Sequence, residues 1–89
     1  MSFTAPQIAQ GTLSGGAAQT FTALAPANQE LMVENTDLAN NLTVKINGSS
    51  GAWLLYPGGK IGYAPKGGID KVILTPSTNT NTTFQIFIG

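Results

Sequence analysis

The chain has 89 residues, of which 42% are hydrophobic, only 9% are charged and none is Cys or His. Four basic residues balance four acidic ones, so the formal net charge is zero at pH 7. This composition excludes disulfides, thiol chemistry and metal sites built from Cys or His, and it disfavours nucleic-acid binding, which needs clustered positive charge.

A chain of this length forms one domain whose stability margin is thin. Without disulfides or an expected cofactor, we expect homo-oligomerisation or docking onto a partner protein to stabilise it. The charged fraction is far below the roughly 25% of an average soluble domain. A surface of hydroxyls and amides is easier to desolvate against another protein, although a domain that merely tolerates a neutral surface would have the same composition.

The sequence also indicates in which compartment the protein is made. No run of apolar residues is long enough to span a membrane as a helix, so no membrane partner is expected. The first residues lack a basic region followed by an apolar run, which is the pattern of a signal peptide. We therefore expect the protein to be made in a cytoplasm.

Residues 1–18 differ in character from the rest of the chain. Small residues dominate, and Phe3, Ile8 and Leu13 are spaced five apart. Five is neither the strand period nor the helix period. We interpret this segment as an extended N-terminal arm that places its apolar residues on a neighbouring surface. The alternatives are a partly ordered tail and a first strand packed on its own domain.

From residue 19 to residue 89 the pattern is that of a β domain. Apolar and polar residues alternate in short runs that are separated by Gly, Pro and Asn. Asn47-Gly48 suits a tight turn with positive φ, and Pro57-Gly58 suits a type II turn. This spacing predicts an all-β fold, either a small antiparallel β-sandwich or a barrel, with no helix. The expected strands cover residues 19–23, 31–34, 42–46, 52–56, 60–64, 71–75 and 84–88.

The alternation also predicts the core. Side chains in phase with one another should share the buried face of each strand. These residues are Phe21, Leu31, Val33, Leu42, Val44, Ile46, Leu74, Phe84 and Ile86.

No constellation of catalytic residues is visible. Glu30 and Glu34 share a strand face but lie about 13 Å apart along it. Paired carboxylates in glycosidases lie about 5–9.5 Å apart. No Ser has a His to activate it, and no Ser-x-x-Lys pattern occurs. We therefore expect that the protein is not an enzyme.

A set of apolar and aromatic residues lies out of phase with the expected core or on the arm. Such a set can form an interface with another protein, or it can be covered within the monomer. Trp53, Tyr56 and Tyr63 would also suit a carbohydrate-binding module. The candidate interface residues are Phe3, Ile8, Leu13, Met32, Trp53, Leu55, Tyr56, Tyr63, Ile73 and Phe87.

The order of strands and turns resembles that of the small β-sandwich virion proteins of tailed bacteriophages. The resemblance lies in a strand, the Asn47-Gly48 turn, the Trp53 strand, the Pro57-Gly58 turn and a final strand, over residues 33–36, 42–48, 52–61, 71–76 and 83–86. It implies a capsid decoration (cement) subunit that binds the major capsid protein or another virion protein, and itself, in a virion assembled in the host cytoplasm. The alternatives are a phage tail or fibre component and a carbohydrate-binding module.

Overall fold

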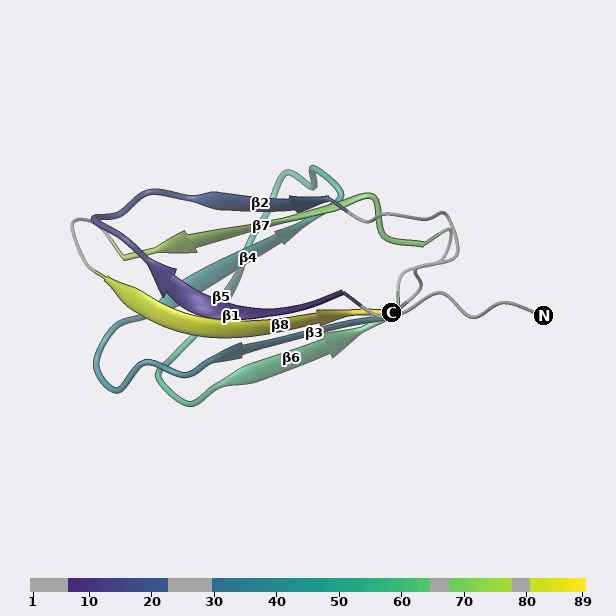
Figure 1. The fold of residues 1–89 in the computed structure, drawn as a ribbon. Coiled ribbons are helices and arrows are strands. Elements are labelled where there is room, and N and C mark those ends of the chain that lie inside the picture. Colours follow the sequence, from purple (N-terminus) through teal and green to yellow (C-terminus); the bar gives the residue numbers. More distant parts are fainter. Residues whose placement is uncertain (1–6, 23–29, 65–67, 78–80) are drawn as a thin grey trace.

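The chain folds into two antiparallel four-stranded sheets that stack face to face (Figure 1). The computed structural model describes residues 7–22, 30–64, 68–77 and 81–89, and these contain no helix. Sheet A contains, in spatial order, β1 (Gln7–Leu13), β8 (Thr82–Ile88), β3 (Leu31–Asn35) and β6 (Lys60–Tyr63). Sheet B contains β2 (Gln19–Thr22), β7 (Lys71–Pro76), β4 (Leu42–Ile46) and β5 (Trp53–Leu55). The predicted small antiparallel β-sandwich is confirmed.

Alternate side chains of both sheets fill the space between them. Every residue of the predicted core is buried except Ile46, which is partly buried and packs against the core. Phe21 of sheet B meets Phe84 of sheet A edge to face, with ring centroids 5.6 Å apart and planes at 67°. Aromatic pairs favour this geometry. The strand phases predicted for β3, β4, β7 and β8 are therefore confirmed.

The predicted arm is wrong for residues 7–13, which form the edge strand β1. This strand pairs with β8 from Gln7↔Ile88 to Leu13↔Thr82, and Leu13 is buried in the core instead of lying at an interface. The inward positions before Leu13 are Ala9 and Gly11, whose small size hides the alternation. A Cβ on Gly11 would lie 3.8 Å from Phe84 Cε1, so the Phe84 ring covers this glycine. Phe3 lies outside the described residues.

The phase predicted for β5 is also wrong. Leu55 was predicted to lie out of phase with the core, but it is buried, whereas the adjacent Leu54 is 43% exposed. Leu55 pairs with Leu42, which is fully buried. All three residues of β5 are apolar, so the strand has no alternation from which its inner face could be read.

Both predicted turns are confirmed. Asn47 and Gly48 have φ values of 54° and 69°, and the Ser49 N–H donates to the Ile46 carbonyl at 3.1 Å. Two successive residues with positive φ are typical of a type I′ turn, which here opens the connection from β4 to β5. In the turn after Tyr56, Gly58 has a φ of 80°.

The side chain of Asn35 links the two sheets at one end. It is fully buried, and its Nδ2 donates to the Leu55 carbonyl at 3.0 Å and to the Asn40 carbonyl at 2.8 Å. Its Oδ1 accepts a hydrogen bond from the Asp37 N–H at 3.0 Å, and its backbone N–H donates to the Gly59 carbonyl at 2.8 Å. The end of β5 and the turn leading to β6 are therefore held against β3.

The assigned core predicts the cost of creating cavities. Val44→Ala and Phe84→Ala should each lower the free energy of unfolding by about 2–4 kcal/mol, because both side chains are buried and the space they leave is not refilled. Chemical denaturation measures this. Leu38→Ala is the control, since Leu38 is 97% exposed and should change little. Wild-type stability of both core variants would contradict the assigned strand phases.

The place of β1 in sheet A predicts the result of a truncation. Removing residues 1–18 deletes a strand paired along its length with β8 and a buried leucine, so the melting temperature should fall steeply. Leu13→Ala should lower stability by about 2–4 kcal/mol, while Gln10→Ala, exposed on the same strand, should have little effect. A truncated chain that melts like the full chain would show that β1 is dispensable.

Candidate functional site

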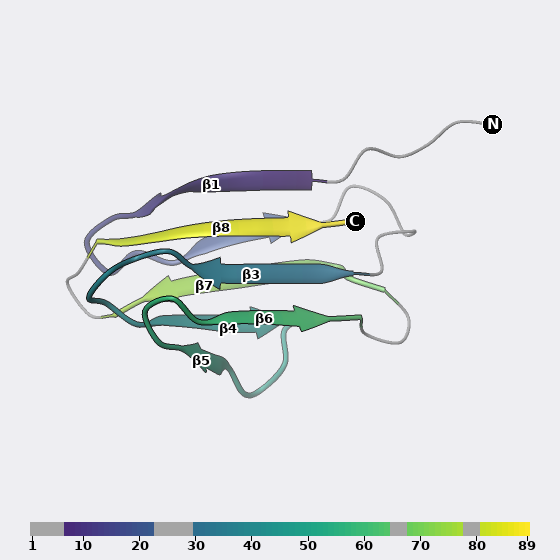
Figure 2. The ribbon, with the colours of Figure 1, turned by 90° about the horizontal axis from the view of Figure 1, so that it is seen from below.

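The candidate site lies along the side of the sandwich where both sheets end. β5 is the edge of sheet B and β6 is the edge of sheet A, and Figure 2 shows them on the same side of the molecule, opposite β1. The chain crosses from one to the other through the turn that Asn35 holds. This end of the side is therefore closed by the chain itself.

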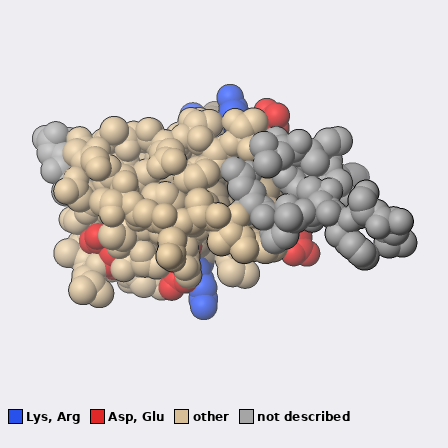
Figure 3. Space-filling model, viewed as in Figure 1, with Lys and Arg blue, Asp and Glu red and all other residues tan. Residues whose placement is uncertain are grey.

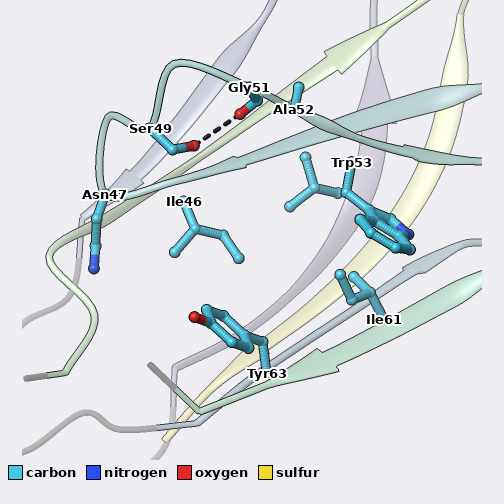
Figure 4. Close-up of a pocket in the computed structure, with 9 residues that line it drawn as sticks. Ile46, Asn47, Ser49, Gly51, Ala52, Trp53, Ile61 and Tyr63 are labelled. Atoms are coloured by element: carbon cyan, nitrogen blue, oxygen red, sulfur yellow. Dashed lines mark hydrogen bonds between the residues drawn. The ribbon is translucent and has the colours of Figure 1, made fainter. Parts of the chain in front are cut away.

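Beyond the turn, a groove of about 590 Å³ opens between the two edges. Val44, Ile46 and Trp53 line it from sheet B, and Ile61 and Tyr63 line it from sheet A (Figure 4). Its volume is in the range of ligand-binding sites. The groove is a stretch of the space between the sheets that the chain leaves open to solvent.

The strand register explains why these side chains face the groove. Trp53 pairs with the buried Val44, and Ile61 pairs with the buried Val33, so all four point toward the opposite sheet. Trp53 nevertheless remains 61% exposed and Tyr63 remains 52% exposed, because no strand continues either sheet beyond β5 and β6 within the described residues. Two aromatic side chains therefore stand at the mouth of an apolar groove.

The polar side chains at one end of the groove already have partners. Asn47 Nδ2 donates to the Gly68 carbonyl at 3.0 Å, and its Oδ1 accepts from the backbone N–H of Asp70 at 2.7 Å. Ser49 Oγ donates to the Gly51 carbonyl at 2.7 Å (Figure 4). No charged side chain is among the described residues that line the groove. Its recognition chemistry is therefore mainly apolar and aromatic.

A second apolar surface lies on the outer face of sheet A. Ile8, Phe87 and Met32 occupy one row across β1, β8 and β3, because Ile8 pairs with Phe87 and Phe87 pairs with Met32. Ile8 is 69% exposed and Met32 is 53% exposed. The row borders a shallow hollow of about 90 Å³, to which Glu34 and Gln85 also contribute.

The remaining candidate interface residues are dispersed. Tyr56 is 65% exposed but does not line the groove, and Ile73 lies partly buried on the outer face of sheet B. Leu13 and Leu55 are core residues, which corrects their assignment to an exposed interface. Sequence reasoning missed Ile61 and Ile46 as groove residues, and only the order of strands in the two sheets reveals them.

The acidic side chains mainly serve the structure. Gln85 Nε2 donates to Glu34 Oε1 at 2.6 Å. The Asp37 carboxylate accepts backbone hydrogen bonds from Ala39 at 3.0 Å, from Asn40 at 2.8 Å and from Thr83 at 3.2 Å. The bonds from Ala39 and Asn40 are the main reason that the pKa of Asp37 lies below its ordinary value of 3.8. Asp37 is thus a carboxylate that orders the loop after β3.

Clusters of metal-binding side chains and membrane-spanning helices are both absent from the described residues. These residues contain no group of three or more His, Cys, Asp or Glu side chains that could hold a metal ion. They also contain no helix long and apolar enough to cross a membrane. Figure 3 shows the few charged side chains scattered over a largely uncharged face.

Comparison with known proteins finds a structure with a similar fold but no matching family. No family model and no curated protein matches the chain. Among solved structures, the chain is similar to PliG of Aeromonas hydrophila, a periplasmic lysozyme inhibitor of g-type lysozyme. The two are 14% identical with a TM-score of 0.57, over 94% of this chain and 84% of PliG. At this identity the likeness shows a common fold alone.

This comparison overturns the predicted virion role. A solved structure that shares the fold is a periplasmic lysozyme inhibitor and not a capsid, tail or fibre protein. The prediction of a capsid decoration subunit is therefore corrected. Its basis was the succession of short strands and turns, which β-sandwiches of unrelated function share.

The hydrogen bonds of Asp37 predict how stability depends on pH. The folded-state pKa is lowered, so the stabilisation is fully present above the ordinary value of 3.8 and is lost as the pH falls through the folded-state pKa. Wild type should therefore be more stable than Asp37→Asn at neutral pH, and the difference should shrink below pH 3.8. Denaturant titrations over this range measure it. A difference that does not change with pH would contradict the role of the ionised carboxylate.

Proposed function

We propose that this chain is a non-catalytic module that binds an extended, uncharged segment of a partner protein in the groove between β5 and β6. The observation that carries the proposal is the open apolar groove between two edge strands, with Trp53 and Tyr63 at its mouth. A segment that entered it would complete the core of the sandwich on its open side.

The free edge of β6 offers backbone groups to which a segment could bind. In an antiparallel sheet, alternate residues of an edge strand direct their N–H and C=O groups away from the sheet. β6 pairs with β3 on one side, and no described strand pairs with its other side. An added strand could therefore bond to the backbone of β6 while its alternate side chains enter the groove.

Charge and the fold comparison agree with a protein partner. The chain has zero net charge and an uncharged groove lining, so the segment it accepts should also lack charge. PliG, which shares the fold, is an inhibitor of a lysozyme, so this fold can carry protein recognition. That support is one of analogy, and the groove itself is the primary argument.

Carbohydrate binding is the second candidate, and it rests on the exposed rings of Trp53 and Tyr63. Sugars stack on aromatic rings but also need free hydrogen-bonding groups for their hydroxyls. The side chains of Asn47 and Ser49 at the end of the groove already have backbone partners. The apolar lining therefore favours a peptide over a sugar.

The proposal predicts a binding signal from a single side chain. Trp53 is the only Trp in the chain and lines the groove, so its fluorescence reports on this site. A short blocked peptide of alternating Val and Thr should shift the emission to shorter wavelength in a saturable manner. Tyr63→Ser should weaken this binding at least about tenfold, because the ring loses apolar contact worth about 1.5–3 kcal/mol.

Tyr56→Ser is the matched control, because Tyr56 is also more than half exposed but lies outside the groove lining. The same peptide methylated on alternate backbone nitrogens should bind weakly if it adds to the edge of β6. No response to the peptide, together with a Tyr63-dependent response to an oligosaccharide, would replace this proposal with the carbohydrate function. A lysis assay with g-type lysozyme adds a folded-protein probe, since PliG inhibits that enzyme.

A further inference from the structure

We propose that the outer face of sheet A is a self-association surface on which a second copy of the chain packs face to face, with Ile8 of each copy seated over Gly62 of the other. This inference is independent of the groove, because it concerns the opposite face of sheet A. It rests on one row of residues across the four strands of this sheet.

The row consists of Ile8, Phe87, Met32 and Gly62, one residue from each strand in spatial order. The first three are large apolar side chains, and Ile8 and Met32 are more than half exposed. A contiguous apolar patch that none of the described residues covers is typical of an interface. The fourth position carries no side chain.

Gly62 is the observation that points to a closely approaching partner. Glycine inside a strand weakens it and often marks close approach by another backbone or a ligand. Gly62 does not have a positive φ. A Cβ built on it would meet only the Leu31 carbonyl oxygen, at 3.9 Å, among the described residues. Neither backbone conformation nor crowding within this part of the chain therefore requires glycine here.

Gly11 provides the contrast within the same sheet. It also lies inside an edge strand, but a Cβ there would face the Phe84 ring at 3.8 Å on the inner side of the sandwich. A side chain longer than one Cβ at position 11 would thus extend toward the Phe84 ring in the core. A side chain at position 62 would extend from the outer face, where its Cβ meets no described residue except Leu31.

A two-fold axis makes the row complementary to itself. Consider an axis that runs parallel to the strands, midway between β8 and β3 and just above the sheet. It reverses the strand order of the second copy, so that Ile8 lies over the partner's Gly62 and Phe87 lies over the partner's Met32. Ile8, which is 69% exposed at one end of the row, then packs over the space that Gly62 leaves at the other end. Two sheets packed with nearly aligned strands are a common arrangement.

The charges beside the row favour a second copy as the occupant. The next row contains Gln10, Gln85, Glu34 and Lys60, with Glu34 directly opposite Lys60. One acid and one base leave this row without net charge, so the row itself does not make two copies repel each other. A strongly acidic or basic partner would find no complementary charge.

The experiment is sedimentation equilibrium of the full chain from micromolar to millimolar concentrations. Wild type should form a dimer. Ile8→Thr, which shortens the protrusion, and Gly62→Val, which fills the gap, should each raise the dimer dissociation constant at least about tenfold. The dilute Gly62→Val chain should melt no lower than wild type, because Val suits a strand better than Gly. Weaker association would then not come from unfolding.

Ile73→Thr is the matched control, since Ile73 occupies the outer face of the other sheet. It should leave the dimer unchanged. Because the chain has no Cys, Ile8→Cys and Gly62→Cys can also be mixed and joined with a short thiol-specific crosslinker. The mixture should crosslink faster than either variant alone.

A wild-type chain that stays monomeric at millimolar concentration would overturn the proposal. So would a Gly62→Val chain that dimerises like wild type, or an Ile73→Thr chain that loses the dimer as Ile8→Thr does. Equal crosslinking of the mixture and of the single variants would overturn the two-fold arrangement.

Discussion

The buried side chain of Asn35 is the constraint on which the shape of this sandwich depends. It lies at the end of β3 in sheet A, yet it donates a hydrogen bond to the last residue of β5 in sheet B and another to the loop that follows β3. A buried amide is costly unless its hydrogen bonds are made, and this one makes three, one to β5 and two to the loop after β3. The crossover from β5 to β6 is thereby held at one end. At the other end no hydrogen bond among the described residues joins these two strands, and there the groove opens.

The proposed binding groove on the open side of the sandwich lowers the stability of the domain. A domain of this size has little apolar burial to spare, and leaving Trp53 and Tyr63 half exposed gives up some of it. Free edges also invite unwanted strand pairing. β5 has only three residues and β6 begins with Lys60, and both features are common on protected edges. The edge therefore resists indiscriminate pairing while it keeps an apolar groove accessible.

The sequence predicted those parts of the fold in which local chemistry and tertiary position agree. β3, β4, β7 and β8 alternate clearly, and the Asn47-Gly48 and Pro57-Gly58 turns contain the residues that their φ values require. β1 was missed because its inward residues are Ala9 and Gly11, and the phase of β5 was wrong because all its residues are apolar. The groove and the row on sheet A arise from the order of strands in space, which no local pattern encodes. The virion role was wrong because it was inferred from an order of strands and turns that many folds share.

The two proposed surfaces share one strand, β6, so binding of a segment in the groove and dimerisation would affect each other. In β6, Ile61 and Tyr63 face the groove while Gly62, between them, faces the outer surface. A segment bound in the groove would give β6 a partner on its free side and so restrict its motion. A second copy packed over Gly62 would then meet an edge strand that is already ordered, and less conformational entropy would be lost on dimerisation. By reciprocity the dimer would bind the segment more tightly than the monomer does. The sign of this coupling would be favourable if both binding events restrict the motion of the same strand, β6.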